Sequence, residues 1–102
     1  MNWLDQIEDN QEEKQFEIRV DGELAFAQYI PRNGYIVYPH TVVPKAIGGQ
    51  GIGDALATYA MNYARERDLK VKPYCPFIAR FMKDNFEQYG DLLAEGFRLP
   101  AK

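Results

Sequence analysis

The sequence predicts an α/β (α+β) fold, with a mostly antiparallel sheet, one βαβ unit and two main helices. Three observations predict it. Residues 16–20 alternate apolar and polar side chains, which is typical of a strand with one solvent-facing side. Turn signals follow this segment and the next one, at Asp21-Gly22 and at Pro31-Arg32-Asn33-Gly34. A glycine-rich segment, residues 48–53, then connects an apolar run to a helical pattern.

The size and composition of the chain indicate one domain. A chain of 102 residues can bury one modest core and is too short for two. Its 46% hydrophobic residues suffice for a packed interior, and its 26% charged residues predict a water-exposed surface. We divide it into a polar N-terminal arm (residues 1–15), a folded domain (16–93) and a C-terminal tail (94–102). We expect the arm to be loosely ordered or weakly helical and outside the core, and the tail to fray.

Charge and hydropathy argue against two classes of partner. The net charge of −3 and the lack of a dense Lys/Arg stripe disfavour nucleic acid. No apolar run approaches the length of a membrane span, and the first residues lack the pattern of a secretory signal. The single cysteine, Cys75, cannot form an intrachain disulfide, which agrees with a reducing compartment. We therefore expect a cytoplasmic protein that binds neither nucleic acid nor membrane.

Three strands are expected in the first half of the chain. Residues 16–20 form the first strand, and Asp21-Gly22 makes a hairpin to a second strand over residues 24–30. Residues 35–43 are rich in β-branched and aromatic side chains and form the third strand. Because proline cannot donate a hydrogen bond to a neighbouring strand, Pro39 predicts a bulge or a split in this strand.

The second half predicts helix, strand and helix. Apolar residues at three- and four-residue spacings predict a helix of about four turns that ends near Arg67, with Ile52, Leu56, Tyr59, Ala60 and Tyr63 on its buried face. Residues 69–74 form a short strand, parallel to the third strand in a βαβ unit. Cys75-Pro76 starts the second helix, whose predicted buried stripe is Phe77, Ile78, Phe81 and Met82.

The glycine-rich segment Gly48-Gly49-Gln50-Gly51-Ile52-Gly53, called the elbow below, predicts a phosphate site. Glycines permit left-handed turns and carry no Cβ, so several N–H groups can converge on one anion at a helix start. Gly53-Asp54-Ala55 lacks the lysine and hydroxyl of a nucleotide-hydrolysing loop, and the glycine spacing does not fit the dinucleotide pattern. The alternative is a purely structural turn. Four glycines in six residues cost more backbone entropy than such a turn requires, which favours the functional interpretation.

This arrangement resembles the GNAT superfamily of acetyl-CoA-dependent N-acetyltransferases. The GNAT motif is Arg or Gln, two residues, Gly, one residue, then Gly or Ala, and Gly51 and Gly53 match its glycines. Gly48 stands where the motif has Arg or Gln. Together with the elbow, the runs 40–44 and 72–77 are similar to a small stand-alone GNAT-like family with a Cys-Pro-Phe segment. The resemblance covers roughly residues 16–93.

The resemblance implies a compact GNAT-like fold and acetyl-CoA as the acetyl donor. It implies that the elbow binds the coenzyme A pyrophosphate through the backbone of Gly48, Gly49, Gln50, Gly51, Ile52 and Gly53. It also implies that the backbone of Thr41, Val42 and Val43 pairs with the pantetheine arm like an added strand.

Two residues are candidates for catalysis. Cys75 lies at the start of a helix, whose positive end favours a thiolate, and it could protonate the departing coenzyme A sulfur or accept the acetyl group. His40, the single histidine, could take a proton from the amine. A buried apolar role for Cys75 and a structural role for His40 stay open. Tyr74 and Tyr89 are further candidates for a general acid, with packing as the default. One His and one Cys are too few for a metal site.

We therefore expect an acetyl-CoA-dependent N-acetyltransferase that acts on an unidentified small-molecule or peptide amine. The alternative is a non-catalytic acyl-CoA-binding or protein-interaction module with the same fold, which Gly48 favours. A third possibility is an enzyme that forms an acyl-thioester on Cys75. The short chain leaves room only for a shallow acceptor site, so completion of the site in a homodimer is also open.

Overall fold

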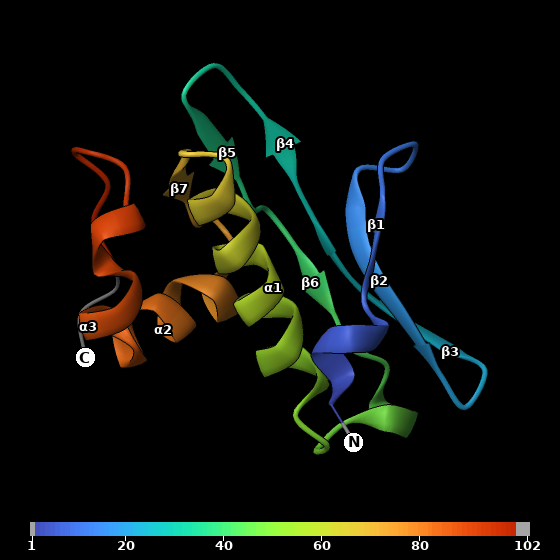
Figure 1. Cartoon of the computed structure of the whole chain (residues 1–102). Coiled ribbons are helices and arrows are strands. Elements are labelled where there is room, and N and C mark those ends of the chain that lie inside the picture. Colours follow the sequence, from blue (N-terminus) through green and yellow to red (C-terminus); the bar gives the residue numbers. More distant parts are fainter. Residues whose placement is uncertain (1, 100–102) are drawn as a thin grey trace.

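The computed structural model describes residues 2–99, which form a split sheet with helices packed on it (Figure 1). The strands are β1 (Glu8–Asn10), β2 (Gln15–Val20), β3 (Glu23–Gln28), β4 (Ile30–Pro31), β5 (Tyr35–Val37), β6 (Thr41–Val42) and β7 (Lys70–Lys72). The α-helices are α1 (Ile52–Glu66), α2 (Pro76–Asp84) and α3 (Phe86–Tyr89). Short 3-10 helices are η1 (Trp3–Gln6), η2 (Lys45–Ile47) and η3 (Gly90–Leu92). Among the described residues no helix is long and apolar enough to cross a membrane.

The sheet consists of two parts that share two long chain segments. One part has the strand order β1-β2-β3-β6 and the other β4-β5-β7. β4 follows β3 after one residue, and β6 follows β5 after a short break, so the same two segments run through both parts. Every pair is antiparallel except β5 with β7, which is parallel, as the predicted βαβ unit requires.

The register confirms a bulge at Pro39. Ile30 lies opposite Val37, and continuing this pairing back along the chain would place Ala27 opposite His40. Ala27 instead lies opposite Thr41, so the strand that contains Pro39 carries one extra residue. A bulge bends its strand and increases the local twist. The predicted third strand is therefore split into β5 and β6, which pair with different neighbours.

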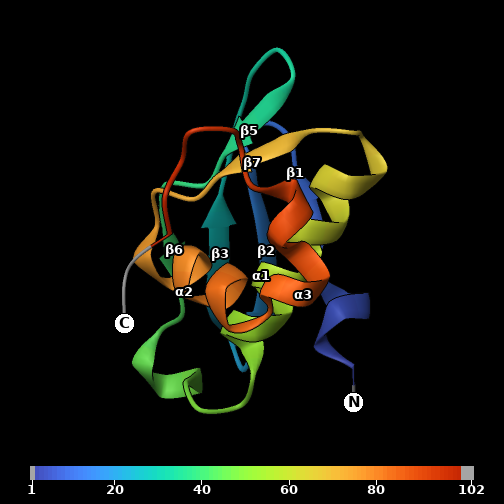
Figure 2. The same cartoon turned by 90° about the vertical axis from the view of Figure 1, so that its left-hand side faces the viewer.

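The core lies between one face of the sheet and α1 (Figures 1 and 2). The predicted strand at residues 16–20 is confirmed, with its apolar residues buried. In β3 the buried residues are Ala25 and Ala27, and the larger Leu24 and Phe26 lie half-buried on the opposite face. α1 places three fully buried alanines in the core, and such small residues allow a helix to approach a strand closely.

Both predicted main helices are confirmed, and α3 adds a third, short one. α1 ends at Glu66, one residue before the predicted end. α2 begins at Pro76 with Cys75 as its N-cap residue. Its buried residues are Ile78, Ala79 and Met82, whereas Phe77 is 39% exposed. The predicted stripe is therefore wrong at Phe77, whose ring instead covers Gly53 at the start of α1.

Both ends of the described chain pack against the fold. We expected an arm outside the core, but β1 pairs with β2 and Ile7 is buried. In the tail the Ala94 N–H donates to the Val71 oxygen at 2.9 Å, and the Phe97 ring meets the Tyr74 ring edge-to-face at 5.1 Å. The fraying expected for the tail is thus wrong for residues 94–97, whereas residues 100–102 lie outside the described part. The domain boundaries stay a prediction.

Candidate functional site

The elbow joins η2 to α1 through two left-handed glycines. Gly49 has φ 77° and Gly51, the N-cap residue of α1, has φ 86°. A residue with a Cβ is strained in this region, which explains why the sequence carries glycine at both positions. No side chain caps the start of α1.

The elbow presents a run of unpaired backbone N–H groups. Among residues 2–99 no acceptor binds the N–H of any residue from Gly49 to Asp54, and the first paired amide is that of Ala55, which donates to the Gly51 oxygen at 3.0 Å. The Gly48 N–H differs from its neighbours, because it donates to the Lys45 oxygen at 3.1 Å. Unpaired amides and the helix dipole together attract an anion.

β6 offers a free backbone edge close to the elbow in sequence. The Gln28 N–H donates to the His40 oxygen at 2.9 Å, so this is a hydrogen-bonded pair of the antiparallel ladder. Such pairs alternate with pairs whose backbone N–H and C=O groups point outward, that is, away from the neighbouring strand. The outward groups on this side belong to Thr41, which lies opposite Ala27, and by the same alternation to Val43. β6 is the last strand of its part of the sheet, and no described strand pairs with this edge.

Cys75 lies where the parallel strands separate. The Tyr38 N–H donates to the Lys72 oxygen at 3.1 Å, and the Cys75 N–H donates to the Tyr38 oxygen at 2.8 Å. Beyond this point β6 pairs with β3, while the chain after Cys75 becomes α2. The Cys75 thiol is 4% exposed, and its Sγ–H donates to Thr41 Oγ1 at 3.5 Å. This contact places the predicted thiol beside the predicted pantetheine strand.

The structure does not bring His40 and Cys75 together. Residues directly opposite one another in a sheet share a face, and successive residues alternate between faces. Thr41 shares the inner face with Ala27, whereas His40 shares the outer face with Gln28. His40 is exposed and Cys75 is buried, so β6 lies between the two candidates.

The two candidate tyrosines lie in different surroundings. Tyr74 is 62% exposed next to Phe97. Tyr89 is buried, and its ring stacks on Phe81 with centroids 5.7 Å apart. The position of Tyr89 favours the packing role. No group of three or more His, Cys, Asp and Glu side chains suited to a metal ion occurs within residues 2–99.

One residue at the elbow was missed in the sequence. The Trp3 Nε1–H donates to the Gln50 oxygen at 2.8 Å, although 47 positions separate the two residues. The only signal was a tryptophan in a mostly polar segment. Beside the elbow lies a hollow of about 290 Å³, lined by Asn2, Trp3, Leu4, Gly51, Asp54, Ala55 and Thr58.

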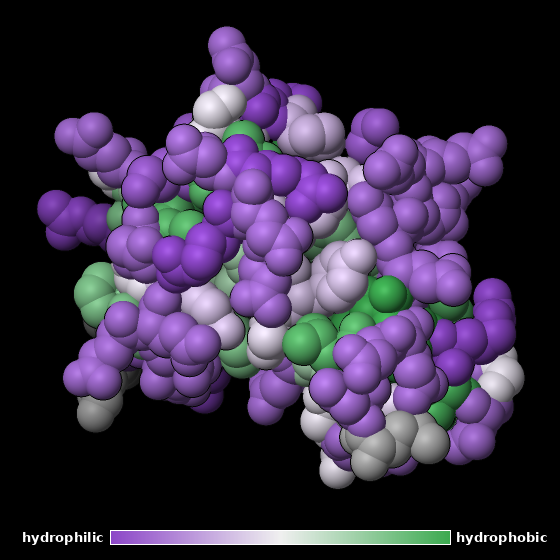
Figure 3. Space-filling model, in the orientation of Figure 1, coloured by the Kyte–Doolittle hydropathy of each residue, from purple (hydrophilic) through white to green (hydrophobic). Residues whose placement is uncertain are grey.

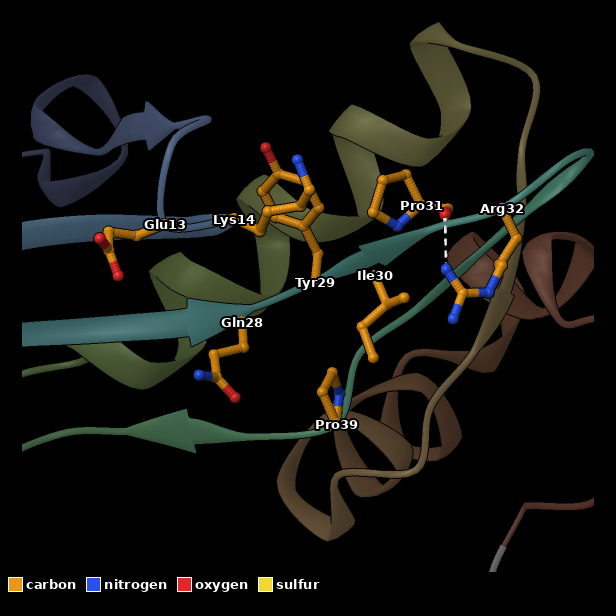
Figure 4. A pocket seen from close by; sticks show the side chains of 8 residues that line it. All are labelled: Glu13, Lys14, Gln28, Tyr29, Ile30, Pro31, Arg32 and Pro39. Carbon is orange, nitrogen blue, oxygen red and sulfur yellow. Dashed lines mark hydrogen bonds between the residues drawn. The ribbon is translucent and has the colours of Figure 1, made fainter.

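A second hollow, of about 400 Å³, lies away from the elbow at the edge of β4 (Figure 4). Figure 4 shows Gln28, Ile30 and Pro39 on one side of the β3–β4 segment, and Lys14 and Tyr29 on the other. Glu13, Pro31 and Arg32 complete its lining. Gln28 lies opposite His40 in the sheet, and both side chains belong to the outer face. This hollow therefore reaches the face of the sheet on which His40 lies.

Comparisons with known proteins bear on the family and the fold of this chain. A family model described as GCN5-related N-acetyl-transferase matches residues 15–92. Protein NATD1 of Xenopus tropicalis is 31% identical over 83 residues, which span 78% of this chain and 75% of that protein. Protein NATD1 of Homo sapiens is 30% identical over 83 residues, which span 78% and 73%.

A solved structure is similar over most of the chain. It is the NMR solution structure of a GCN5-like candidate N-acetyltransferase from Staphylococcus aureus, with a TM-score of 0.64 and 34% sequence identity. The similarity covers 86% of each chain.

Proposed function

Because this chain belongs to the family of GCN5-related N-acetyltransferases, we propose that it transfers the acetyl group of acetyl-CoA to an amine. The observation that carries the proposal is the run of unpaired N–H groups from Gly49 to Asp54. A pyrophosphate carries the charge and the acceptor oxygens that such a group of amides binds. The elbow is thus the proposed pyrophosphate site.

The rest of the cofactor would follow the free edge of β6. The outward groups of Thr41 and Val43 can pair with the amides of the pantetheine arm in the manner of an added strand, with Val42 between them. The thioester would then reach the point where the Cys75 thiol contacts Thr41 of β6. Gly48 contributes less than the other elbow residues, because its N–H is already paired.

The transfer itself is a direct attack. The amine nitrogen forms a bond with the thioester carbonyl carbon, the C–S bond breaks, and coenzyme A leaves as a thiolate. In this proposal the backbone N–H of Thr41 polarises the carbonyl, and the Cys75 thiol gives its proton to the departing sulfur. His40, or a water molecule beside it, takes the proton from the amine.

The acceptor would approach from the opposite face of the sheet. His40 and Gln28 share that face, and Gln28 lines the hollow of about 400 Å³ at the edge of β4. Cofactor and acceptor then meet at β6 from two sides, which agrees with the separation of Cys75 from His40. The hollow is open and has room for a small amine or for one side chain of a peptide.

A second candidate function is binding without turnover. Gly48 replaces the Arg or Gln of the GNAT motif, and its paired N–H removes one donor from the elbow. A non-catalytic acyl-CoA-binding module would retain the remaining amides. Incubation with labelled acetyl-CoA and a panel of amines separates the two, because only the enzyme forms an acetylated amine.

The elbow can be tested with two matched glycine substitutions. Gly51 and Gly34 both have φ 86°, and a Cβ at either position would meet no atom within 4 Å. Gly51→Ala and Gly34→Ala should therefore lose a similar stability, about 1–2 kcal/mol each, from the left-handed backbone. Only Gly51→Ala reorients elbow amides, and we expect it to raise the Kd for coenzyme A roughly tenfold in calorimetric titration.

The Gly34→Ala control lies in the turn between β4 and β5, away from the elbow. It should bind coenzyme A as the unsubstituted protein does. Equal weakening by both substitutions would assign the effect to stability. A wild-type titration without detectable binding would overturn the proposed function itself.

A further inference from the structure

The N-terminal turn is attached to the elbow by one specific hydrogen bond. Trp3 Nε1–H donates to the Gln50 oxygen at 2.8 Å. Gln50 lies between the two left-handed glycines, Gly49 and Gly51. Its own side-chain amide donates to the Ile47 oxygen at 3.2 Å, which ties the elbow back to η2. Gln50, between the two left-handed glycines, is therefore held from two directions.

Trp3 is the first residue of η1, which packs on the fold. The Asn2 side chain accepts a hydrogen bond from the Leu4 N–H at 3.0 Å, which caps this turn. Trp3 and Leu4 pack on the core, and η1 contacts α1. Small hydrophobic patches interrupt the hydrophilic surface in Figure 3, one of them beside η1. This turn lies outside the family match, which begins at residue 15.

The geometry of the peptide bond gives the contact a consequence for ligand binding. In a trans peptide the C=O of one residue and the N–H of the next point in opposite directions. When Trp3 holds the Gln50 oxygen, the Gly51 N–H must point away from Trp3. Glycine-flanked peptides rotate easily, so without this contact the Gly51 amide would sample other orientations.

We propose that Trp3 is a positioning residue that holds the elbow amides in the orientation that binds the cofactor pyrophosphate. This inference rests on the proposed function for its ligand. The elbow loses its conformational entropy when the protein folds. Binding of the cofactor is therefore not weakened by a further loss of entropy in this loop. η1 is thereby a part of the cofactor site that residues 15–92 do not contain.

Trp3→Phe tests the inference because it keeps an aromatic ring on the core and removes the Nε1–H donor, together with the five-membered part of the indole. In ligand-free protein, NMR relaxation should show lower order for the amides from Gly49 to Gly53. Calorimetry should show a roughly fivefold higher Kd for coenzyme A, the size expected for the loss of one positioning hydrogen bond. In turnover with acetyl-CoA the KM should rise while kcat stays unchanged.

Tyr38→Phe is the matched control, since it also removes one hydrogen bond, from the Tyr38 hydroxyl to the Ala60 oxygen, inside the core. It should leave elbow order and coenzyme A affinity unchanged. If NMR relaxation showed the same order for the elbow amides in Trp3→Phe and in the wild type, the inference would be overturned, whether or not the Kd for coenzyme A changed. Wild-type protein that binds no coenzyme A would overturn the proposed function, while the relaxation data still decide whether Trp3 orders the elbow.

Discussion

At the scale of single residues, the contact between Cys75 and Thr41 joins the start of α2 to β6. Among residues 2–99 the thiol has one hydrogen-bond partner, Thr41 Oγ1, and it has little access to solvent. A buried thiol with a single weak partner can release its proton to a stronger acceptor, and a thiolate leaving group is such an acceptor. Its position therefore suits a proton donor better than an exposed nucleophile.

Cys75→Ala should lower kcat by roughly a hundredfold, within the range for loss of a general acid, and leave the Kd for coenzyme A unchanged. Cys75→Ser, whose hydroxyl is a far weaker acid than a thiol but can still donate a hydrogen bond to the departing sulfur, should recover only a small part of the loss. Steady-state kinetics with acetyl-CoA and an acceptor amine measure both. An unchanged kcat in Cys75→Ala would show that the thiol only fills space, and an acetyl adduct on Cys75 during turnover would favour the acyl-thioester route.

The sequence was informative at single residues where local chemistry decides their position. The left-handed glycines and the N-cap position of Cys75 follow from local backbone rules, and both were predicted. The face of His40 was not predictable, because the bulge at Pro39 interrupts the alternation just before it. The bond from Trp3 to Gln50 depends on tertiary packing across 47 positions, which no local pattern contains.

At the scale of elements, the bulge at Pro39 separates β6 from the parallel pair β5–β7. Without the extra residue, β5 and β6 would continue as one regular strand opposite β3 and β4. The inserted residue bends the strand at the place where the Cys75 thiol meets Thr41. We infer that the bulge keeps the outward edge of β6 open for a ligand.

Deletion of Pro39 should straighten this strand without exchanging its faces, because Tyr38 already faces the core and His40 the outside. We expect a folded protein whose affinity for coenzyme A falls at least tenfold. Circular dichroism and urea unfolding check the fold, and calorimetry measures the affinity. Pro39→Ala is the control, since it keeps the residue count and should keep the affinity. Undiminished binding in the deletion variant would contradict the role given to the bulge.

Element types were easier to predict than the faces they bury. Leu24 and Phe26 marked β3 as a strand, yet the helix on the core side requires small residues, and Ala25 and Ala27 occupy that face. Phe77 fits the helical period of α2 but lies over Gly53. In both elements two faces carry apolar residues, so the partner element decides which face is buried.

At the scale of the whole molecule, an aromatic cluster connects β1, β2, the residue between β3 and β4, and α1. Phe16 stacks on Tyr29 with centroids 4.6 Å apart and also meets Tyr59 and Tyr63 at 4.9 Å and 4.8 Å. The Tyr29 hydroxyl donates to Asp9 Oδ1 at 2.7 Å, so β1 joins this cluster. This contact, together with the β1–β2 pairing and the buried Ile7, attaches the N-terminal segment to the fold although its sequence is mostly polar and acidic.

Three tyrosines packed near Phe16 should make the free energy of unfolding vary with pH in the alkaline range. Burial raises the pKa of Tyr38 far above its usual value. Burial and then the hydrogen bond to Asp9 raise the pKa of Tyr29, and burial raises the pKa of Tyr59. In the unfolded chain a tyrosine loses its proton near pH 10. Above about that pH the folded state therefore holds more protons than the unfolded state, and the free energy of unfolding falls as pH rises.

For the fully buried Tyr38 the expected fall is up to about 1.4 kcal/mol per pH unit above about pH 10, and no fall from this residue below that pH. Urea unfolding from about pH 8 to about pH 11 measures it. Tyr38→Phe should be less stable near neutral pH, because it loses the hydrogen bond to Ala60, yet its stability should decline less steeply in alkali. A decline as steep as that of the wild type would mean that the Tyr38 hydroxyl ionises in the folded protein as readily as in the unfolded chain.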